Sequence, residues 1–257
     1  MKLHCIPILS ALFTSLVCFS NPATKISDNS PSSGIVIRWN DCEQTIDGFG
    51  IAQAGWAKEL FAFKNRKQVM DKMFGNDGLR LNILRGEIFP HYWENKEDKD
   101  FNLNDDINIE LCDSDFNNKS DDLLRRGQLW LTLEAKNKYH INKLVFSTWS
   151  APAWMKSNGK VSNGKLKPEC YQDFANYLAA FYKAYKSKGI TPYAISPSNE
   201  PGYAAPWNSS LWTADEMGKF ITSNLGPTFQ KENIPAKIIF GENPLWSVVM
   251  PQLKMVS

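Results

Sequence analysis

A strand and its abrupt end are encoded by Pro192-Tyr193-Ala194-Ile195 followed by Ser196-Pro197-Ser198-Asn199-Glu200-Pro201. The apolar run predicts a strand, and Pro201 must stop it because proline has no backbone N–H to donate to a sheet. The carboxyl group of Glu200 therefore lies where a strand opens into a loop. In a barrel of parallel strands, catalytic groups gather at this end of the strands.

Strands and helices alternate along the rest of the chain. The expected strands are 44–50, 79–88, 143–149 and 237–240, and the expected helices are 56–74, 121–139 and 168–188. Thr213 and Glu216 form the capping box of a further helix. Strand–helix–strand order at this spacing predicts an α/β fold with a parallel sheet and crossover helices.

The helix expected over 168–188 carries an aromatic stripe. Its members recur every three or four residues, which places them on one face: Tyr171, Phe174, Leu178, Phe181 and Tyr185. We interpret this stripe as the face that packs against the sheet, and not as a binding site.

Composition excludes several classes of function. The chain has 257 residues, of which 43% are hydrophobic, and a net charge of +2 from 29 basic and 27 acidic residues. This balance favours neither nucleic acid nor an anionic membrane surface as a partner. The nine tryptophans mainly indicate core packing, but several fall in loop-like positions, where a flat apolar ring suits stacking on a sugar.

The N-terminal region reads as export and linker sequence. Residues 1–20 have a positive start at Lys2, an apolar stretch too short to span a bilayer, and small residues before Asn21. Residues 21–43 read as a linker that includes a short strand, 35–39, and the main domain follows over 44–257. We therefore expect a secreted protein without a membrane span.

Apparent cofactor motifs are incomplete. Gly159–Lys165 lacks the Ser or Thr that would follow in a phosphate loop, because Leu166 stands there, and Gln53 replaces the third Gly of a dinucleotide fingerprint that starts at Gly48. A calcium-loop match at Asp113 fails at its Gly and its final Glu. With only three histidines, a histidine metal site is not indicated, and we expect neither a cofactor nor a metal.

Polar and aromatic groups mark the ends of four expected strands. These are Arg85 with Glu87, Trp149, Asn199 with Glu200, and Glu242. Each alone has a structural explanation; Arg85, for example, would neutralise a buried carboxylate. Because the ends of parallel strands meet on one face, the four together predict a single pocket.

The chain resembles glycoside hydrolase family 30, the group of glucosylceramidases, glucuronoxylan xylanases and β-1,6-glucanases and galactanases. Four segments carry the resemblance, in the family's order and spacing: Ile46–Gly50, Leu81–Arg85, Ser150–Lys156 and Ile195–Pro201. The resemblance implies a (β/α)8 TIM barrel joined to a small β-domain, to which 35–39 would contribute a strand. It also implies retaining hydrolysis of β-linked glycans: xylan, β-1,6-glucan or galactan, or glucosylceramide.

The resemblance assigns roles by motif position. Glu200 corresponds to the catalytic acid/base, which must be protonated when substrate arrives. Asn199 corresponds to the residue that hydrogen-bonds the sugar 2-hydroxyl, Arg85 to the arginine that keeps the nucleophile ionised, and Trp149 to a wall of the glycone subsite. Further aromatic residues at such loops are expected to line subsites: Trp154, Tyr203 and Trp207.

The family's nucleophile is a Glu at the end of the seventh barrel strand, and the sequence supplies about the first five strands. We therefore expect an incomplete catalytic barrel, inactive by itself, and Glu242 is expected to serve packing or a subsite and not to replace the nucleophile. Two alternatives stay open. One is a non-catalytic carbohydrate-binding fragment, and the other is a chain that does not fold stably.

Overall fold

The computed structural model describes residues 38, 40, 41, 44–53, 56–93, 95–97 and 127–243. The chain divides into two compact units, Met1–Thr45 and Ile46–Ser257, and every described helix and strand belongs to the second. The expected export signal of 1–20 lies outside the described residues, and so does nearly all of the strand expected over 35–39. Among the described helices, none is long and apolar enough to cross a membrane.

The core of the second unit is a five-stranded parallel sheet in the order β1-β2-β3-β4-β5. Its strands are β1 (Gly50–Ala52), β2 (Ile83–Ile88), β3 (Lys143–Thr148), β4 (Ala194–Ser196) and β5 (Lys237–Ile238). Sequential neighbours with helical connections confirm the predicted partial α/β barrel. The register pairs Glu87 with Ser147 and Ser147 with Ser196, so polar residues of three adjacent strands lie at the same height.

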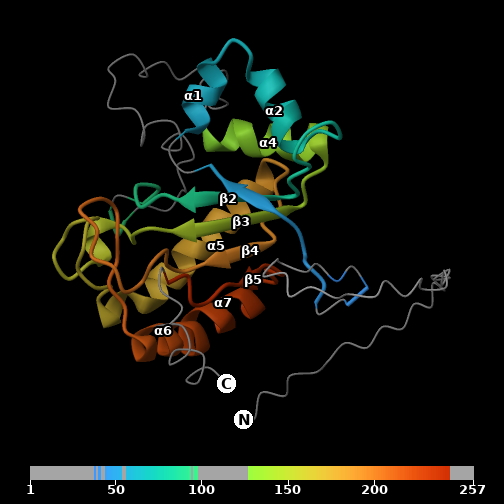
Figure 1. The fold of residues 1–257 in the computed structure, drawn as a ribbon. Coiled ribbons are helices and arrows are strands. Elements are labelled where there is room, and N and C mark those ends of the chain that lie inside the picture. The colour runs from blue at the N-terminus through green and yellow to red at the C-terminus, as the bar shows by residue number, and fades with distance from the viewer. Residues whose placement is uncertain are drawn as a thin grey trace, which may run out of the picture. The chain divides into compact units, whose positions relative to one another are not determined.

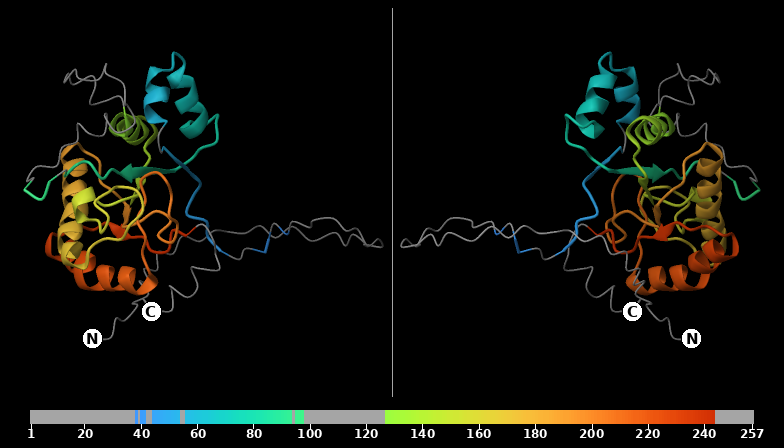
Figure 2. Two further views of the ribbon diagram at one scale, coloured as in Figure 1. Left: turned by 90° about the vertical axis from the view of Figure 1, so that its left-hand side faces the viewer. Right: turned by 90° about the vertical axis from the view of Figure 1, so that its right-hand side faces the viewer.

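The helices form an arc around the outer side of the sheet (Figures 1 and 2). They are α1 (Ala57–Ala62), α2 (Arg66–Phe74), α4 (Gln128–Tyr139), α5 (Tyr171–Ser187), α6 (Ala214–Phe220) and α7 (Gly226–Lys231), with a π-helical turn over Ile221–Leu225. The predicted capping box of α6 is confirmed: the Glu216 amide donates to Thr213 Oγ1, and the Thr213 amide donates to Glu216 Oε2.

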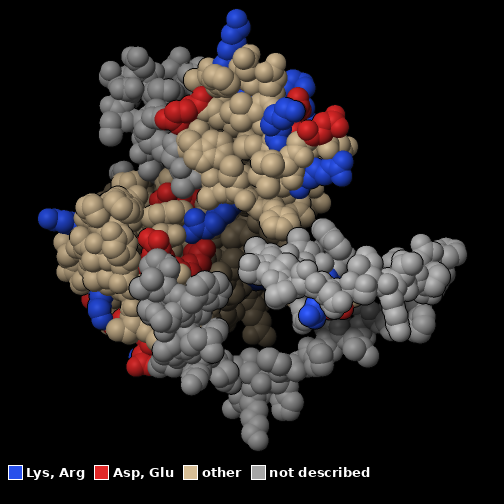
Figure 3. Space-filling model, in the orientation of Figure 1, with Lys and Arg blue, Asp and Glu red and all other residues tan. Residues whose placement is uncertain are grey.

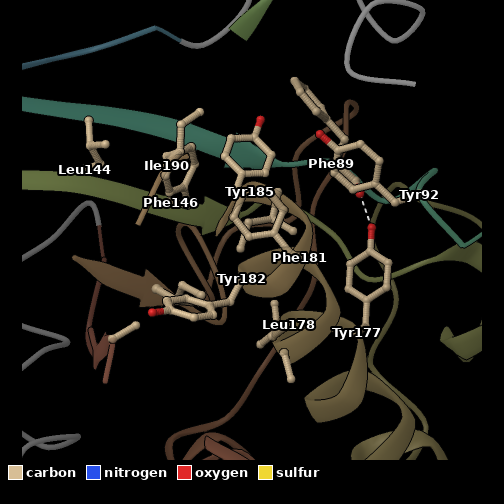
Figure 4. Packing of buried hydrophobic residues seen from close by; sticks show 14 of the residues in the cluster. Phe89, Tyr92, Leu144, Phe146, Tyr177, Leu178, Phe181, Tyr182, Tyr185 and Ile190 are labelled. Carbon is tan, nitrogen blue, oxygen red and sulfur yellow. Dashed lines mark hydrogen bonds between the residues drawn. The ribbon is translucent and has the colours of Figure 1, made fainter. Parts of the chain in front are cut away.

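The C-terminal part of the aromatic stripe of α5, with Phe181 and Tyr185, packs on the sheet as predicted (Figure 4). The N-terminal part differs, because Tyr171 and Phe174 pack on Trp212 and on Phe220 of α6. Phe181 is fully buried, and its ring centroid lies 5.0 Å from that of Phe146 on β3 and 4.3 Å from that of Tyr185. Tyr177 donates a hydrogen bond to the Phe89 carbonyl. The stripe therefore serves the core.

Two of the expected elements differ from those observed. The strand expected over 44–50 begins only at Gly50, because the Asn82 side chain accepts the Phe49 amide (3.0 Å) and so displaces ladder pairing. The helix expected over 56–74 is broken, because Phe63 is extended (φ −71°, ψ 125°) and ends α1.

The remaining boundaries shift by a few residues. Arg80 is left-handed (φ 51°), so β2 starts at Ile83 and not at Leu79. The helix expected from Pro168 opens with a 3-10 turn, Pro168–Cys170, before α5. Strand β5 ends at Ile238, two residues before the expected end.

Candidate active site

The candidate site is built at the carboxyl end of the sheet, where β2 to β5 each contribute a group. Arg85 lies within β2, Trp149 follows β3, Asn199 and Glu200 follow β4, and Glu242 follows β5. A hollow in the molecular surface contains basic atoms beside acidic atoms near the ends of these strands (Figure 3).

Arg85 is the centre of the cluster. Its Nε donates to Glu242 Oε1 (3.1 Å), and its Nη2 donates both to Glu242 Oε2 (3.3 Å) and to Asn199 Oδ1 (2.8 Å). The guanidinium carbon lies 4.6 Å from the centroid of the Trp149 ring, in cation–π geometry. Because both partners are mostly buried, with side-chain exposures of 23% for Arg85 and 19% for Glu242, this fork-to-carboxylate pair is weakly screened by solvent.

Ser147 is a second residue that donates a hydrogen bond to the Glu242 carboxylate. Its hydroxyl donates to Glu242 Oε2 at 2.5 Å, and the residue is fully buried on β3. The sequence analysis did not single out Ser147. Ser147 lies two residues after Val145, the register partner of Arg85, so it shares the face of the sheet that carries the Arg85 cluster. Arg85 is thus the counter-ion of Glu242, a pairing that the sequence analysis, which expected a packing or subsite role, did not predict.

Backbone hydrogen bonds fix Asn199 and Glu200 to neighbouring strands. The Asn199 amide donates to the Thr148 carbonyl (2.6 Å), and the Glu200 amide donates to the Glu242 carbonyl (2.9 Å). Thr148 Oγ1 in turn donates to the Pro197 carbonyl at 2.5 Å. Glu200 is half-buried and has a left-handed backbone (φ 44°), which a residue with a Cβ adopts only at a cost.

Exposed aromatic rings continue from Glu200 along the following loop. The Tyr203 amide donates to the Glu200 carbonyl (2.9 Å), which holds the backbones of the two residues together. Tyr203 and Trp207 are 46% and 55% exposed, and their ring centroids lie 6.3 Å apart. Large exposed aromatic rings that lie together indicate a surface that binds another molecule.

The structure thus brings together Arg85, Trp149 and Asn199 by direct contact, and ties Glu200 and Tyr203 to them through the backbone. Trp154 is placed differently. It is partly buried in a 3-10 turn, Ala153–Met155, and its indole N–H donates to the Trp93 carbonyl (3.2 Å). Among the described residues, no group of three or more His, Cys, Asp or Glu side chains could hold a metal ion.

Comparison with known proteins identifies the family. The profile of the glycosyl hydrolase family 30 TIM-barrel domain matches residues 46–241. The chain belongs to glycosyl hydrolase family 30. The family 30 match covers all five strands and every group of the Arg85 cluster except Glu242.

Relatives of this family 30 chain act on several glycans. It is 28% identical over 237 residues to an endo-1,6-beta-D-glucanase of Neurospora crassa, which covers 85% of this chain and 45% of the relative. It is 30% identical over 123 residues to the lysosomal acid glucosylceramidase of Mus musculus, covering 42% of this chain and 24% of the relative. The chain therefore spans less than half the length of these curated relatives.

A solved structure supports the same assignment. The catalytic domain of the GH30 xylanase C from Talaromyces cellulolyticus superposes with a TM-score of 0.66 and 26% sequence identity. The superposition covers 83% of this chain and 51% of that domain. The five-stranded sheet thus matches about half of a family 30 catalytic domain.

Proposed function

We propose that this family 30 chain supplies the acid/base side of a retaining glycoside hydrolase that acts on β-linked glycans. The observation that carries the proposal is the hydrogen bond from the Glu200 amide to the Glu242 carbonyl. It holds Glu200 beside the residue whose carboxylate binds Arg85, at the catalytic end of the sheet.

In this proposal Glu200 gives a proton to the glycosidic oxygen as the bond to the leaving group breaks. A second carboxylate attacks the anomeric carbon, and Glu200 then takes a proton from the water that releases the sugar. The nucleophile of family 30 belongs to the seventh strand of the barrel, and that strand is not among the five that the structure describes. Glu242 is not given this role, because it follows β5 and not the seventh strand.

The neighbouring groups would orient the sugar. Asn199 would donate its side-chain N–H to the 2-hydroxyl, since its Oδ1 already accepts from Arg85. Trp149, held by the guanidinium on one face, would form a wall of the glycone subsite. Arg85 would stabilise the ionised nucleophile as well as Glu242. Trp154 is retained as a weaker candidate for a subsite wall.

For the substrate, we propose an extended polysaccharide such as xylan, β-1,6-glucan or β-1,6-galactan, ahead of glucosylceramide. The exposed Tyr203 and Trp207 rings support this choice, because a chain of sugars can stack on rings that lie beyond the reacting bond. Export through the signal sequence of 1–20 would bring the protein to such a polymer outside the cell.

Because the seventh strand is not among the five described, the test uses a protein in which this chain is continued by the remaining strands of the barrel. Hydrolysis of β-1,6-glucan, glucuronoxylan and aryl β-glycosides is compared for that protein and its Glu200→Gln and Glu169→Gln variants. Loss of a general acid costs about 10²- to 10⁴-fold in rate. We expect that loss for Glu200→Gln on the natural glycans and a smaller one on aryl glycosides, whose leaving group needs no proton. Glu169 is exposed on the 3-10 turn before α5 and is the matched control, for which full activity is expected.

Two outcomes would contradict the proposal. Undiminished hydrolysis of the natural glycans by Glu200→Gln would remove Glu200 from the acid/base role. Glycan binding without any turnover by the protein that contains the remaining strands would instead assign the chain to non-catalytic carbohydrate-binding proteins.

A further inference from the structure

Lys156 is a buried cation outside the Arg85 cluster. Its residue exposure is 0%, although lysine is among the residues that folded proteins bury least. It forms no ion pair with a carboxylate of any described residue. Burying an unpaired ammonium costs free energy, so the position calls for an explanation beyond core packing.

The ammonium group has three acceptors for its three hydrogens. Lys156 Nζ donates to the Ser209 carbonyl (2.6 Å), to Ser210 Oγ (2.9 Å) and to Ser150 Oγ (3.1 Å). Ser150 follows β3, whereas Ser209 and Ser210 belong to the loop after β4. Lys156 therefore joins the two loops that leave neighbouring strands at the catalytic end of the sheet.

The second of these loops carries the exposed rings. We define the aromatic loop as residues 201–212, which the hydrogen bond from the Trp212 amide to the Pro201 carbonyl closes at 2.7 Å. Within it, Ser209 Oγ lies within donating distance of the carbonyls of Ala205 (2.9 Å) and Trp207 (3.1 Å). A continuous path thus leads from the buried ammonium through Ser209 to the backbone of Trp207.

We propose that Lys156 is a positioning residue that fixes the aromatic loop and thereby sets where Tyr203 and Trp207 meet a glycan that extends from Glu200. The glycan part of this proposal rests on the proposed function. Lys156 touches no reacting atom, so its contribution is to affinity for longer glycans and not to the bond-breaking step.

Backbone hydrogen bonds also join the aromatic loop to the segment that follows Lys156. The Ser209 amide donates to the Val161 carbonyl (3.0 Å), and the Leu211 amide donates to the Gly164 carbonyl (2.9 Å). These bonds join two irregular segments with no strand of their own. We expect these bonds to depend on Lys156, because its ammonium group is the donor to the buried Ser209 carbonyl.

The buried charge leaves a signature in the pH dependence of stability. Burial lowers the pKa of Lys156 from its usual 10.5 to about 8. Between these values the unfolded chain binds more protons than the folded one, so this group makes the free energy of unfolding rise with pH. The nearby charges face elsewhere: Lys165 pairs with Glu216, Lys167 Nζ donates to the Trp154 carbonyl, and Lys160 is exposed.

The test compares Lys156→Met and Ser210→Ala with the control Lys160→Met, the same substitution at an exposed site of the same loop. Backbone hydrogen exchange is measured at Ser209 and Leu211, with Phe146 of β3 as the reference for global opening. We expect exchange at Ser209 and Leu211 to accelerate at least about tenfold in Lys156→Met, and less in Ser210→Ala, with Phe146 changing less. Lys160→Met should match the wild type.

Equal acceleration at Ser209 and Phe146 would overturn the proposal, because a merely structural residue loosens the whole fold. Unchanged exchange at Ser209 and Leu211 would also overturn it. If Lys156→Met does not fold, Ser210→Ala, which keeps the lysine, gives the decision. In addition, the free energy of urea unfolding should rise between pH 8 and 10.5 by more in the wild type than in Lys156→Met.

Glycan binding separates this inference from the proposed function. Quenching of tryptophan fluorescence by β-1,6-gluco-oligosaccharides and xylo-oligosaccharides should need higher concentrations in Lys156→Met, while an aryl β-glycoside should bind as to the wild type. Equal affinity of both proteins for the oligosaccharides would overturn the glycan part. If the wild type binds no glycan, the proposed function fails, and hydrogen exchange alone decides whether Lys156 fixes the loop.

Discussion

The pairing of Arg85 with Glu242 joins residues that are far apart in the sequence. Arg85 comes from β2 and Glu242 follows β5, and the same guanidinium contacts groups that follow β3 and β4. A charge held in this way is oriented before any substrate arrives, so no binding energy is needed to order it. The arginine therefore links groups from four strands, and in the proposed function it also stabilises the nucleophile.

Glu242→Gln should lower the free energy of unfolding by about 1–3 kcal/mol, because a mostly buried guanidinium loses its charged partner. Urea unfolding measures this loss. Glu232→Gln is the matched control, since it removes one partner of an exposed pair with Lys183 and should change stability little. Similar losses in both variants would show that burial adds nothing to the Arg85 pair.

The left-handed backbone of Glu200 makes a separate prediction. Only glycine adopts this region without a steric cost, so Glu200→Gly should be more stable than Glu200→Ala by about 1 kcal/mol. Thermal and urea unfolding of the two variants check the difference.

Glu232, which ends α7 with φ −87°, is the control position, where glycine should be no better than alanine. An alanine variant at Glu200 as stable as the glycine variant would mean that the backbone there is unstrained.

Helix α5 packs a row of buried side chains into the core. Its aromatic face covers β3, and Tyr185 also accepts a hydrogen bond from Gln128 Nε2 of α4 (2.9 Å). The same glutamine bonds the Glu87 backbone of β2 and approaches Gly86 so closely that a Cβ there would lie 2.5 Å from its Oε1. Gly86 is therefore required by the contact between α4 and β2.

Phe181→Ala should lower the free energy of unfolding by about 3–5 kcal/mol, because it empties a fully buried ring site between α5 and β3. Lys183→Ala, on the exposed side of the same helix, is the control: it also introduces alanine into α5 but removes no buried side chain. Urea unfolding should show a large loss for Phe181→Ala only. Comparable stability of the two variants would contradict the assignment of the stripe to the core.

The order of the elements could be predicted from the sequence because local signals determine it. Apolar runs ending at Pro or Gly marked the strands, and Thr213 with Glu216 marked a helix start. The break between α1 and α2 could not be predicted, because Phe63 is an ordinary helix residue and neither Pro nor Gly marks the break. The later start of β1 could not be predicted either, because the contact between Asn82 and Phe49 joins distant residues and does not alter the residue pattern of 44–50.

For the molecule as a whole, the sequence predicted the family and the side of the sheet that carries the site. The contacts of Arg85 with Asn199 and Trp149 agree with the expectation of a single pocket. The three-way binding of Glu242 and the anchoring of Lys156 could not be predicted. They join residues more than fifty positions apart, such as Lys156 and Ser210, and no short motif records a contact of that range.

The sheet also has a consequence at its two outer rims. Within the described residues, β1 hydrogen-bonds only to β2, and β5 only to β4. Phe49 and Ile46, just before β1, are 67% and 60% exposed. A parallel rim flanked by apolar side chains can accept another extended segment in register, so we expect concentrated solutions of this chain to self-associate through intermolecular ladders.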